Sequence, residues 1–216
     1  MSGSRTYGDP CGIARALDLI GERWALLVVR ELVFGPKRYG DLRRGLRGVS
    51  QNVLSQRLRD LEEAGVVARC VLGPPAACRA YELTPRGREL EPVLLALGRW
   101  GNPIPPASTS ATELSPDALA VALKSTFDPG AAGDLRGRYQ LRLGLDAFHA
   151  DVRDGRLQVA RGEIGGADAT LTCDVPTLTA LVFTGGDLGD AVRTGAAAVL
   201  GDTAALRRFL GSFERP

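Results

Sequence analysis

The chain has 216 residues, of which 44% are hydrophobic and 24% are charged. These fractions are those of an ordinary globular protein, and the length allows one large domain or two small ones. No apolar run approaches the roughly 18 residues that a transmembrane helix needs, and the first residues lack the apolar core of a signal peptide. The composition therefore excludes a membrane-spanning class, and we expect a cytoplasmic protein.

The net charge of +2 conceals an asymmetry between the two halves. Residues 1–104 carry 16 Lys/Arg and 11 Asp/Glu, whereas residues 105–216 carry 11 and 14. A basic first half joined to an acidic second half fits a nucleic-acid-binding module coupled to a domain of another kind.

The four cysteines form no CxxC pair, and His149 is the single histidine. We therefore expect no zinc site, and in a cytosolic chain we expect free thiols rather than disulfides. The sequence also lacks a phosphate-binding glycine loop, a GxSxG motif and an HExxH motif. It predicts neither an enzyme nor a bound cofactor or metal.

Residues 10–34 are typical of two amphipathic helices that Gly21 separates. Residues 39–46 predict a third, short helix, with Leu42 and Leu46 on one face. A tight turn then leads into the next helix. Two short helices joined in this way form a helix-turn-helix.

Residues 49–69, VSQNVLSQRLRDLEEAGVVAR, are the stretch around which the chain is organised. Ser50 is expected to cap a helix, because its hydroxyl can accept a hydrogen bond from a first-turn amide, and Gly65 is expected to end it. Leu54, Leu58 and Leu61 repeat at helical spacing and predict the core-facing side. The opposite side carries uncharged polar residues and arginine, which suit readout of base edges in a major groove. A polar surface helix without a partner is the alternative.

Two strands are predicted next, at residues 66–72 and 79–83, with a glycine-proline turn between them. A hairpin directly after a recognition helix forms the wing of a winged helix-turn-helix. Thr84 then caps another helix, which begins at Pro85. The apolar side of this helix is broader than a small winged-helix core can cover, so we expect a dimer surface there.

Four segments together resemble the HxlR-type winged helix-turn-helix transcriptional regulators: CGIARALDLIGERWALLVVREL, KRYGDLRRGL, VSQNVLSQRLRDLEEAGVVAR and YELTPRGREL. The resemblance covers about residues 10–101 and implies a homodimer, commonly a repressor, on a pseudo-palindromic operator in double-stranded DNA. Its recognition helices would enter successive major grooves, with the wings at the flanking minor grooves. Gly12 stands where the family usually has proline after the cysteine.

On this interpretation basic side chains contact phosphates and polar side chains contact bases. The expected phosphate contacts are Lys37, Arg38, Arg43, Arg44, Arg57 and Arg79. The expected contacts of the recognition helix are Ser50, Gln51, Asn52, Ser55, Gln56 and Arg59. The expected dimer interface contains Ile13, Leu17, Leu90, Leu94, Leu97 and Trp100. For each arginine the alternative is a solvated surface residue, and Arg57 can instead support the fold because it adjoins the leucine stripe.

The second half has a pattern of its own, after a linker of proline and small polar residues at 102–112. The expected helices begin at Ser115, run over 176–184 and 188–194, and begin again after Asp202. The expected strands lie at 138–145, 148–152, 157–159, 169–173 and 197–200, with Leu145 facing inward like Tyr139 and with a hairpin turn at Asp154-Gly155. The segments GRYQLRLG, DGRLQVARG, DATLTCDVPTLTALVFTGGDL and VLGDTAALRRFLGSF resemble the sterol carrier protein type two (SCP-2-like) fold. We therefore predict an α+β protein, with a winged helix-turn-helix domain at residues 1–101. An SCP-2-like α/β sandwich with an antiparallel five-stranded sheet is expected at 113–216.

This second resemblance implies a sensor of a hydrophobic or aromatic small molecule. The residues expected to line an apolar cavity are Tyr139, Leu141, Leu143, Phe148, His149, Leu157, Val159, Leu178, Phe183 and Phe209. Tyr139 and His149 are the expected orienting groups. The alternative is that these side chains fill a solid core, as alternating strands usually do.

Two further interpretations stay open. The family resemblance makes Cys11 a candidate redox or electrophile sensor, because a thiolate before a helix start and near Arg15 is favoured electrostatically. Cys11 can equally be a small structural residue, and the wing thiols Cys70 and Cys78 are a second candidate pair. A lipid or small-molecule carrier is the remaining alternative, but it predicts a degraded recognition helix, and this one is intact.

Overall fold

The computed structural model describes residues 6–73, 77–104 and 113–215. It divides the chain into two compact units, Met1–Leu94 and Leu95–Pro216. The division falls within the last helix of the winged domain, whereas the sequence places it at 102–112. Most of that expected linker lies outside the described residues, so the domain limits given above stay a prediction.

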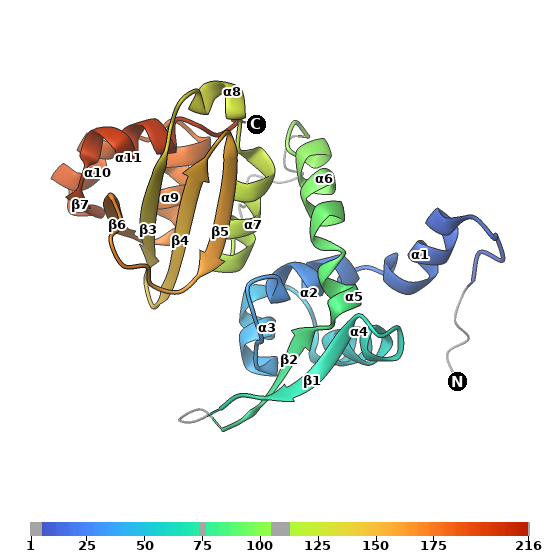
Figure 1. Ribbon diagram of the computed structural model, residues 1–216. Coiled ribbons are helices and arrows are strands. Elements are labelled where there is room, and N and C mark those ends of the chain that lie inside the picture. The colour runs from blue at the N-terminus through green and yellow to red at the C-terminus, as the bar shows by residue number, and fades with distance from the viewer. Residues whose placement is uncertain (1–5, 74–76, 105–112, 216) are drawn as a thin grey trace. The chain divides into compact units, whose positions relative to one another are not determined.

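The first unit alternates short helices with one hairpin (Figure 1). Its helices and strands are α1 (Gly12–Ile20), α2 (Ala25–Leu32), α3 (Tyr39–Gly45), α4 (Gln51–Glu63), β1 (Val67–Val71), β2 (Arg79–Leu83) and α5 (Pro85–Arg88). Helix α6 (Glu91–Gly101) follows and crosses into the second unit. This is the element order of a winged helix-turn-helix, as the sequence predicts.

Helix α4 begins and ends where its side chains dictate. The Oγ of Ser50 accepts a hydrogen bond from the amide of Val53 at 3.3 Å, which is the expected cap. Gly65 adopts φ +67°, a left-handed conformation that glycine reaches without strain, and it ends the helix. Between these points Leu54 and Leu61 are fully buried, so the helix faces the core as expected.

The helix expected after the wing is broken in two, at Glu89 and Leu90. Thr84 caps α5 as expected, by accepting a hydrogen bond from the amide of Gly87 at 3.0 Å. Pro92 accounts for the break, because it has no N–H to donate to the carbonyl of the preceding turn and its ring crowds that carbonyl. The sequence prediction of one continuous helix was therefore wrong.

The second unit packs helices against one sheet (Figure 1). Its helices beyond α6 are α7 (Pro116–Thr126), α8 (Pro129–Ala132), α9 (Val175–Phe183), α10 (Leu188–Arg193) and α11 (Thr203–Leu210). Its strands are β3 (Gly137–Leu143), β4 (Asp146–Arg153), β5 (Arg156–Arg161), β6 (Ala169–Cys173) and β7 (Ala197–Gly201). The sequence patterns do not predict the short helix α8.

The five strands lie in the order β5-β4-β3-β6-β7. The sheet is mixed and not antiparallel, because β3 and β6 run parallel, with Tyr139 opposite Ala169. The segment 162–168 causes this, since it carries the chain from edge strand β5 past β4 and β3 before β6 begins. Local patterns locate strands but not their partners, so the expected antiparallel sheet was wrong in this one pairing.

Two tight hairpins join the first three strands of the sheet. Asp154 and Gly155 make the expected turn, both with positive φ, at 51° and 69°. Gly144 and Leu145 make the other turn, with Gly144 at φ +64°. Leu145 is therefore fully exposed at a hairpin tip and does not continue the inward-facing alternation that the sequence predicts.

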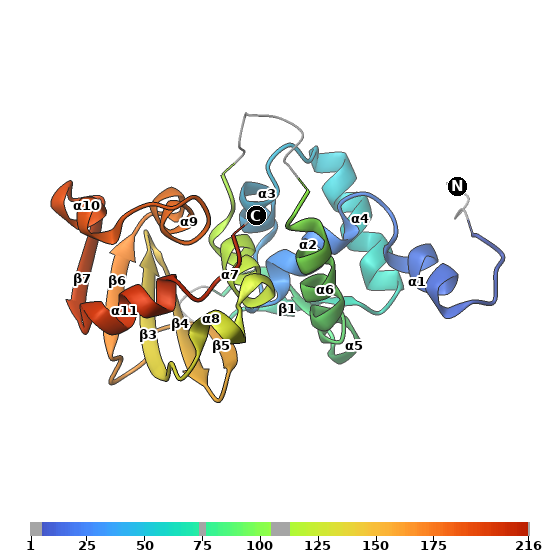
Figure 2. The same ribbon diagram turned by 90° about the horizontal axis from the view of Figure 1, so that it is seen from above.

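Helices α7 and α9 lie on one side of the sheet (Figure 2), and the core of the second unit lies between them and the strands. The rings of Tyr139 on β3 and Phe209 on α11 stack with centroids 4.3 Å apart, and Phe213 meets Phe209 edge-on at 5.2 Å. Phe148 is also buried on this side. The residues that alternate with them, including His149, lie on the opposite side of the sheet, which we call the open face.

None of the helices in the described parts of the chain is both long and apolar enough to span a bilayer.

Tyr139 gives a test of how this core is held together. Its hydroxyl is buried without a hydrogen-bond partner among the described residues, and burial raises the pKa of this group. We expect Tyr139→Phe to leave the free energy of unfolding unchanged or to raise it by up to about 1 kcal/mol, because a buried unpaired hydroxyl costs energy. Phe209→Ala should lower it by about 3–5 kcal/mol. Urea denaturation measures both, and a clear loss in Tyr139→Phe would show a bonded hydroxyl.

Candidate DNA-binding surface and second-domain pocket

Tyr39 braces the recognition helix against the helix before it. Its hydroxyl lies 3.0 Å from the backbone oxygen of Gln51, to which it donates, and 3.2 Å from the Oγ of Ser55. The aromatic ring packs against the core of the first unit. This contact fixes the angle between α3 and α4 at the end of α4 that would enter a groove. The sequence predicts only a helix at Tyr39 and carries no signal of this role.

A second network lies further along α4 and is centred on Asp60. Gln56 donates to Asp60 at 2.6 Å and accepts from Arg59 at 2.7 Å. Arg57 lies 3.1 Å from Asp60 and 3.6 Å from Glu22, with its side chain 17% exposed. Arg57 thus supports the fold, the alternative recognised from its place beside the leucine stripe.

The side chains expected to contact DNA differ in their exposure to solvent. Ser50, Gln51 and Asn52 are exposed at the first turn of α4. The expected arginines outside α4 are all exposed, and Arg44 pairs with Asp41; they are Arg38, Arg43, Arg44 and Arg79. Ser55 is half-buried by Tyr39, so its side chain is turned toward α3. The first turn of α4 and these arginines are therefore the parts of the surface best placed to meet DNA.

Lys37 is held inside the domain and is not a surface cation. Its Nζ donates to the carboxylate of Glu31 at 2.8 Å, and its side chain is 14% exposed. Glu31 is itself fully buried and also accepts from Arg30 at 2.9 Å. A Cβ at Gly45 would lie 2.3 Å from that carboxylate, so α3 approaches it closely. Lys37 belongs to this buried ion pair, which sequence reasoning could not foresee because its partner is buried on another element.

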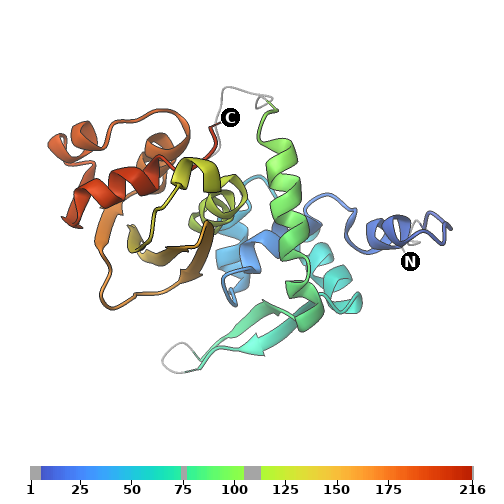
Figure 3. The ribbon, with the colours of Figure 1, turned by 45° about the horizontal axis from the view of Figure 1, so that its top comes forward.

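The wing, β1 with β2, extends as a hairpin beyond the helices of its unit (Figure 3). The backbones of Lys37 and Tyr81 exchange two hydrogen bonds, at 2.8 and 2.9 Å, which tie the wing to the segment before α3. Cys70 lies opposite Ala80, while the carbonyl of Cys78 accepts from the amide of Leu72. The two wing thiols are therefore diagonal neighbours, and both are free.

The expected dimer residues divide into two groups. Ile13 and Trp100 are 72% and 74% exposed, and Leu17 and Leu97 are 42% and 45% exposed. Leu94 is buried in the core of the first unit, and Leu90 packs against that core. Leu90 and Leu94 therefore serve the core. Uncovered apolar side chains remain on α1 in the first unit and on the part of α6 that belongs to the second.

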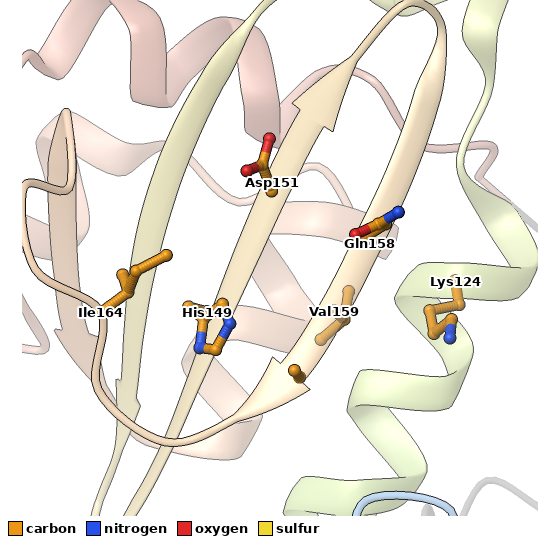
Figure 4. Close-up of a pocket in the computed structure, with 7 residues that line it drawn as sticks. Lys124, His149, Asp151, Gln158, Val159 and Ile164 are labelled. Carbon is orange, nitrogen blue, oxygen red and sulfur yellow. The ribbon is translucent and has the colours of Figure 1, made fainter.

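The expected cavity-lining residues are mostly packed into the core of the second unit. Those buried are Tyr139, Leu141, Leu143, Phe148, Val159, Leu178 and Phe209. Leu157, Phe183 and His149 are half-buried. A pocket of about 410 Å³ lies along β4 and β5, lined by Lys124, His149, Asp151, Gln158, Val159, Ala160 and Ile164 (Figure 4). His149 and Val159 are the predicted residues that it contains, and its other polar groups come from positions without a local signal.

The described residues hold no cluster of three or more histidine, cysteine or acidic side chains that could bind a metal ion.

The fold and the first turn of α4 define a winged helix-turn-helix of the DNA-binding class. Residues 19–108 match the model of the HxlR-like helix-turn-helix family, and residues 107–216 match the model of the alkyl sulfatase C-terminal domain. The chain is 42% identical over 90 residues to an uncharacterized HTH-type transcriptional regulator of Mycobacterium tuberculosis, covering 42% of this chain and 56% of that one. It thus spans just over half of this relative.

A second HTH-type transcriptional regulator, from Synechocystis, is 41% identical over 95 residues, which are 44% of this chain and 70% of that one. A structure of a double mutant of the sec-alkyl sulfatase PisA1 is 24% identical with a TM-score of 0.43, and covers 47% of this chain and 16% of that one.

The chain belongs to the HxlR-like helix-turn-helix family through its first half and to the alkyl sulfatase C-terminal family through its second. The first assignment agrees with the resemblance seen in the sequence. The second half matches the alkyl sulfatase model and not a sterol carrier protein model. The family comparison therefore does not confirm the predicted SCP-2-like domain.

The brace on α4 can be tested through Tyr39. We expect Tyr39→Phe to weaken binding to a specific DNA site and to lower the free energy of unfolding by about 1 kcal/mol, since the hydroxyl makes two contacts. Tyr7→Phe is the matched control, because Tyr7 is 67% exposed. DNA titration and urea denaturation measure the two effects. Equal behaviour of the two variants would exclude the brace.

The thiols should differ in reactivity according to burial. Cys11 is exposed at the N-cap of α1, whereas burial raises the pKa of Cys173 to about 12. Burial is also the main cause that raises the pKa of Cys70. Since the thiolate is the nucleophile, we expect iodoacetamide at pH 8 to alkylate Cys11 first and to leave Cys173 unmodified in the native protein. Mass spectrometry of the peptides measures this, with the unfolded chain as control, and early modification of Cys173 would contradict it.

Proposed function

We propose that the protein is a dimeric transcriptional regulator, acting as a repressor, that binds a pseudo-palindromic operator in double-stranded DNA. The observation that carries this proposal is the first turn of α4. It leaves Ser50, Gln51 and Asn52 exposed while Tyr39 holds the backbone beneath them. A rigid helix end with exposed amide side chains is suited to base edges in a major groove. Such a protein acts in the cytoplasm, at the nucleoid.

The contacts divide by chemistry. Gln51 and Asn52 can each offer a donor and an acceptor to one base, which gives sequence preference. Arg38, Arg43 and Arg79 lie at the start of α3, on α3 and on the wing, and would contact phosphates. These contacts give affinity on any sequence and most of its salt dependence.

Dimerisation is supported by the uncovered apolar side chains of α1 and α6. Trp100 and Ile13 are the most exposed of them, and large exposed aromatic residues are typical of interfaces. A two-fold dimer would place its two recognition helices one helical turn of DNA apart, which requires a pseudo-palindromic operator.

For the second domain we propose effector sensing, with no catalytic reaction of its own. The relatives that match the first half are transcriptional regulators, which favours a regulatory role for the domain joined to it. The interior of the domain is filled by stacked aromatic side chains, which leaves little room for a hydrophobic or aromatic ligand there. A ligand bound at the surface of the sheet fits this packing better. An effector can change operator affinity only as far as it binds the DNA-bound and DNA-free conformations of the protein with different affinities.

A redox regulator is the second candidate. Cys11 is exposed at the N-cap of α1, beside the apolar residues proposed for the dimer, so oxidation there would disturb the interface. Loss of operator binding on mild oxidation, absent in Cys11→Ser, would favour this candidate over effector sensing.

The readout role of α4 leads to a direct test. An operator is first selected from random duplexes with the full-length protein. We expect Gln51→Ala with Asn52→Ala to weaken binding to this operator by about tenfold or more, because each base contact is worth about 1–3 kcal/mol. Binding to unrelated DNA should change little. Fluorescence anisotropy at fixed salt measures both.

Arg43→Ala is the matched control in that experiment, since it removes a proposed phosphate contact near the same helix. It should weaken binding to both DNAs alike and lower the slope of log affinity against log salt by about one. Sedimentation of the complex should show two chains per operator. An equal loss on both DNAs in the double variant would disprove base readout by α4.

A further inference from the structure

The pocket along β4 and β5 has walls that are already fixed. Gln140, which is 1% exposed, donates to the carbonyl of Phe148 at 2.9 Å and accepts from the amide of Ile164 at 2.8 Å. The segment after β5 is thus held against the open face by a side chain of β3. Ile164 therefore forms one wall without rearrangement, which lowers the entropy cost of binding a ligand.

His149 presents a hydrogen-bond acceptor to this pocket. Its Nδ1 lies 3.4 Å from the carbonyl oxygen of Gly162, and a carbonyl only accepts. This contact favours the tautomer with hydrogen on Nδ1, which leaves the lone pair on Nε2. The side chain stands on β4 among the residues that line the pocket (Figure 4).

Asp151 supplies a carboxylate two residues further along the same face of β4. Its Oδ1 is buried and lies 2.9 Å from the Nε of Arg153, but in a direction that makes no hydrogen bond within the described residues. The pair is formed with an arginine side chain that is 67% exposed, and such pairs contribute at most about 1 kcal/mol. Gln158 lies directly across from Asp151 on β5 and adds an amide.

The chemistry of these groups selects a ligand. A carboxylate, an imidazole lone pair and an amide oxygen together accept from a group with several N–H donors and a positive charge. Lys124 lines the pocket from α7, and its positive charge weakens the attraction for any cation, so the single carboxylate of Asp151 can hold one positive charge at most. Ala160 and Ile164 supply apolar surface for the rest of the molecule.

We infer that this pocket binds a small organic monocation, a primary amine with a short apolar chain, and that it is the effector site of the second domain. The second part of the inference rests on the proposed regulatory function, whereas amine binding does not. The pocket lies on the open face and is distinct from the aromatic core of Tyr139 and Phe209.

The test uses the full-length protein labelled with nitrogen-15 and titrated with n-butylamine at pH 7.5. We expect saturable shifts of the backbone amide signals of β4 and β5. 1-Butanol and butyrate, which share the chain but not the cation, should cause none. Asp151→Asn should raise the dissociation constant for n-butylamine by about tenfold or more, because a charge-assisted hydrogen bond is lost.

Glu163→Gln is the matched control, since Glu163 is an exposed acid of the neighbouring segment that pairs with Arg142 and does not line the pocket. It should bind n-butylamine as the unchanged protein does. Absence of saturable shifts, equal binding by the Asp151→Asn variant, or preferential binding of butyrate would each overturn the inference.

The effector role is tested separately, by operator titration with and without saturating n-butylamine. We expect the amine to change operator affinity in the unchanged protein and not in Asp151→Asn. Amine binding with unchanged operator affinity would overturn the effector role alone. Failure of operator binding in every condition would instead count against the proposed DNA-binding function.

Discussion

Glu31 brings a negative charge into the interior of the first domain, where it is fully buried. Removal of one partner from a buried ion pair typically costs about 3–5 kcal/mol, because the remaining charge is left without solvation. Here the partner Lys37 also exchanges backbone hydrogen bonds with Tyr81 of the wing, and Gly45 brings α3 against the carboxylate. The orientation of wing and helix-turn-helix thus depends on one carboxylate, although Glu31 would contact no DNA.

Local sequence patterns were enough to predict most of the helices, strands and turns. The Ser50 cap, the Gly65 end of α4 and the Asp154-Gly155 turn each involve residues within one turn or hairpin, and the structure contains all three. The predictions that failed concerned contacts between distant segments or positions where two local signals compete. The parallel pairing of β3 with β6 depends on the path of a distant segment, and Pro92 overrode the apolar periodicity that predicted one long helix.

The candidate sites divide in the same way. The exposed first turn of α4 followed from helical periodicity, since three leucines fix which side faces the core and so which side does not. The burial of Lys37 and the brace from Tyr39 depend on side chains that meet only after folding. The pocket combines residues of β4 and β5 with Lys124 of α7, and no local pattern in the sequence shows that these elements meet there.

Strand β7 closes one edge of the sheet, and its sequence Ala-Ala-Val-Leu-Gly carries no charge. Its Leu200 is 75% exposed, and such an edge offers its outward backbone N–H and C=O groups to any other strand. Edge strands in natural proteins are commonly protected by lysine, proline or a bulge, and the other edge, β5, begins and ends with arginine. Edge-to-edge aggregation of the second domain at high concentration would therefore begin at β7, and Leu200→Lys is the substitution that would suppress it.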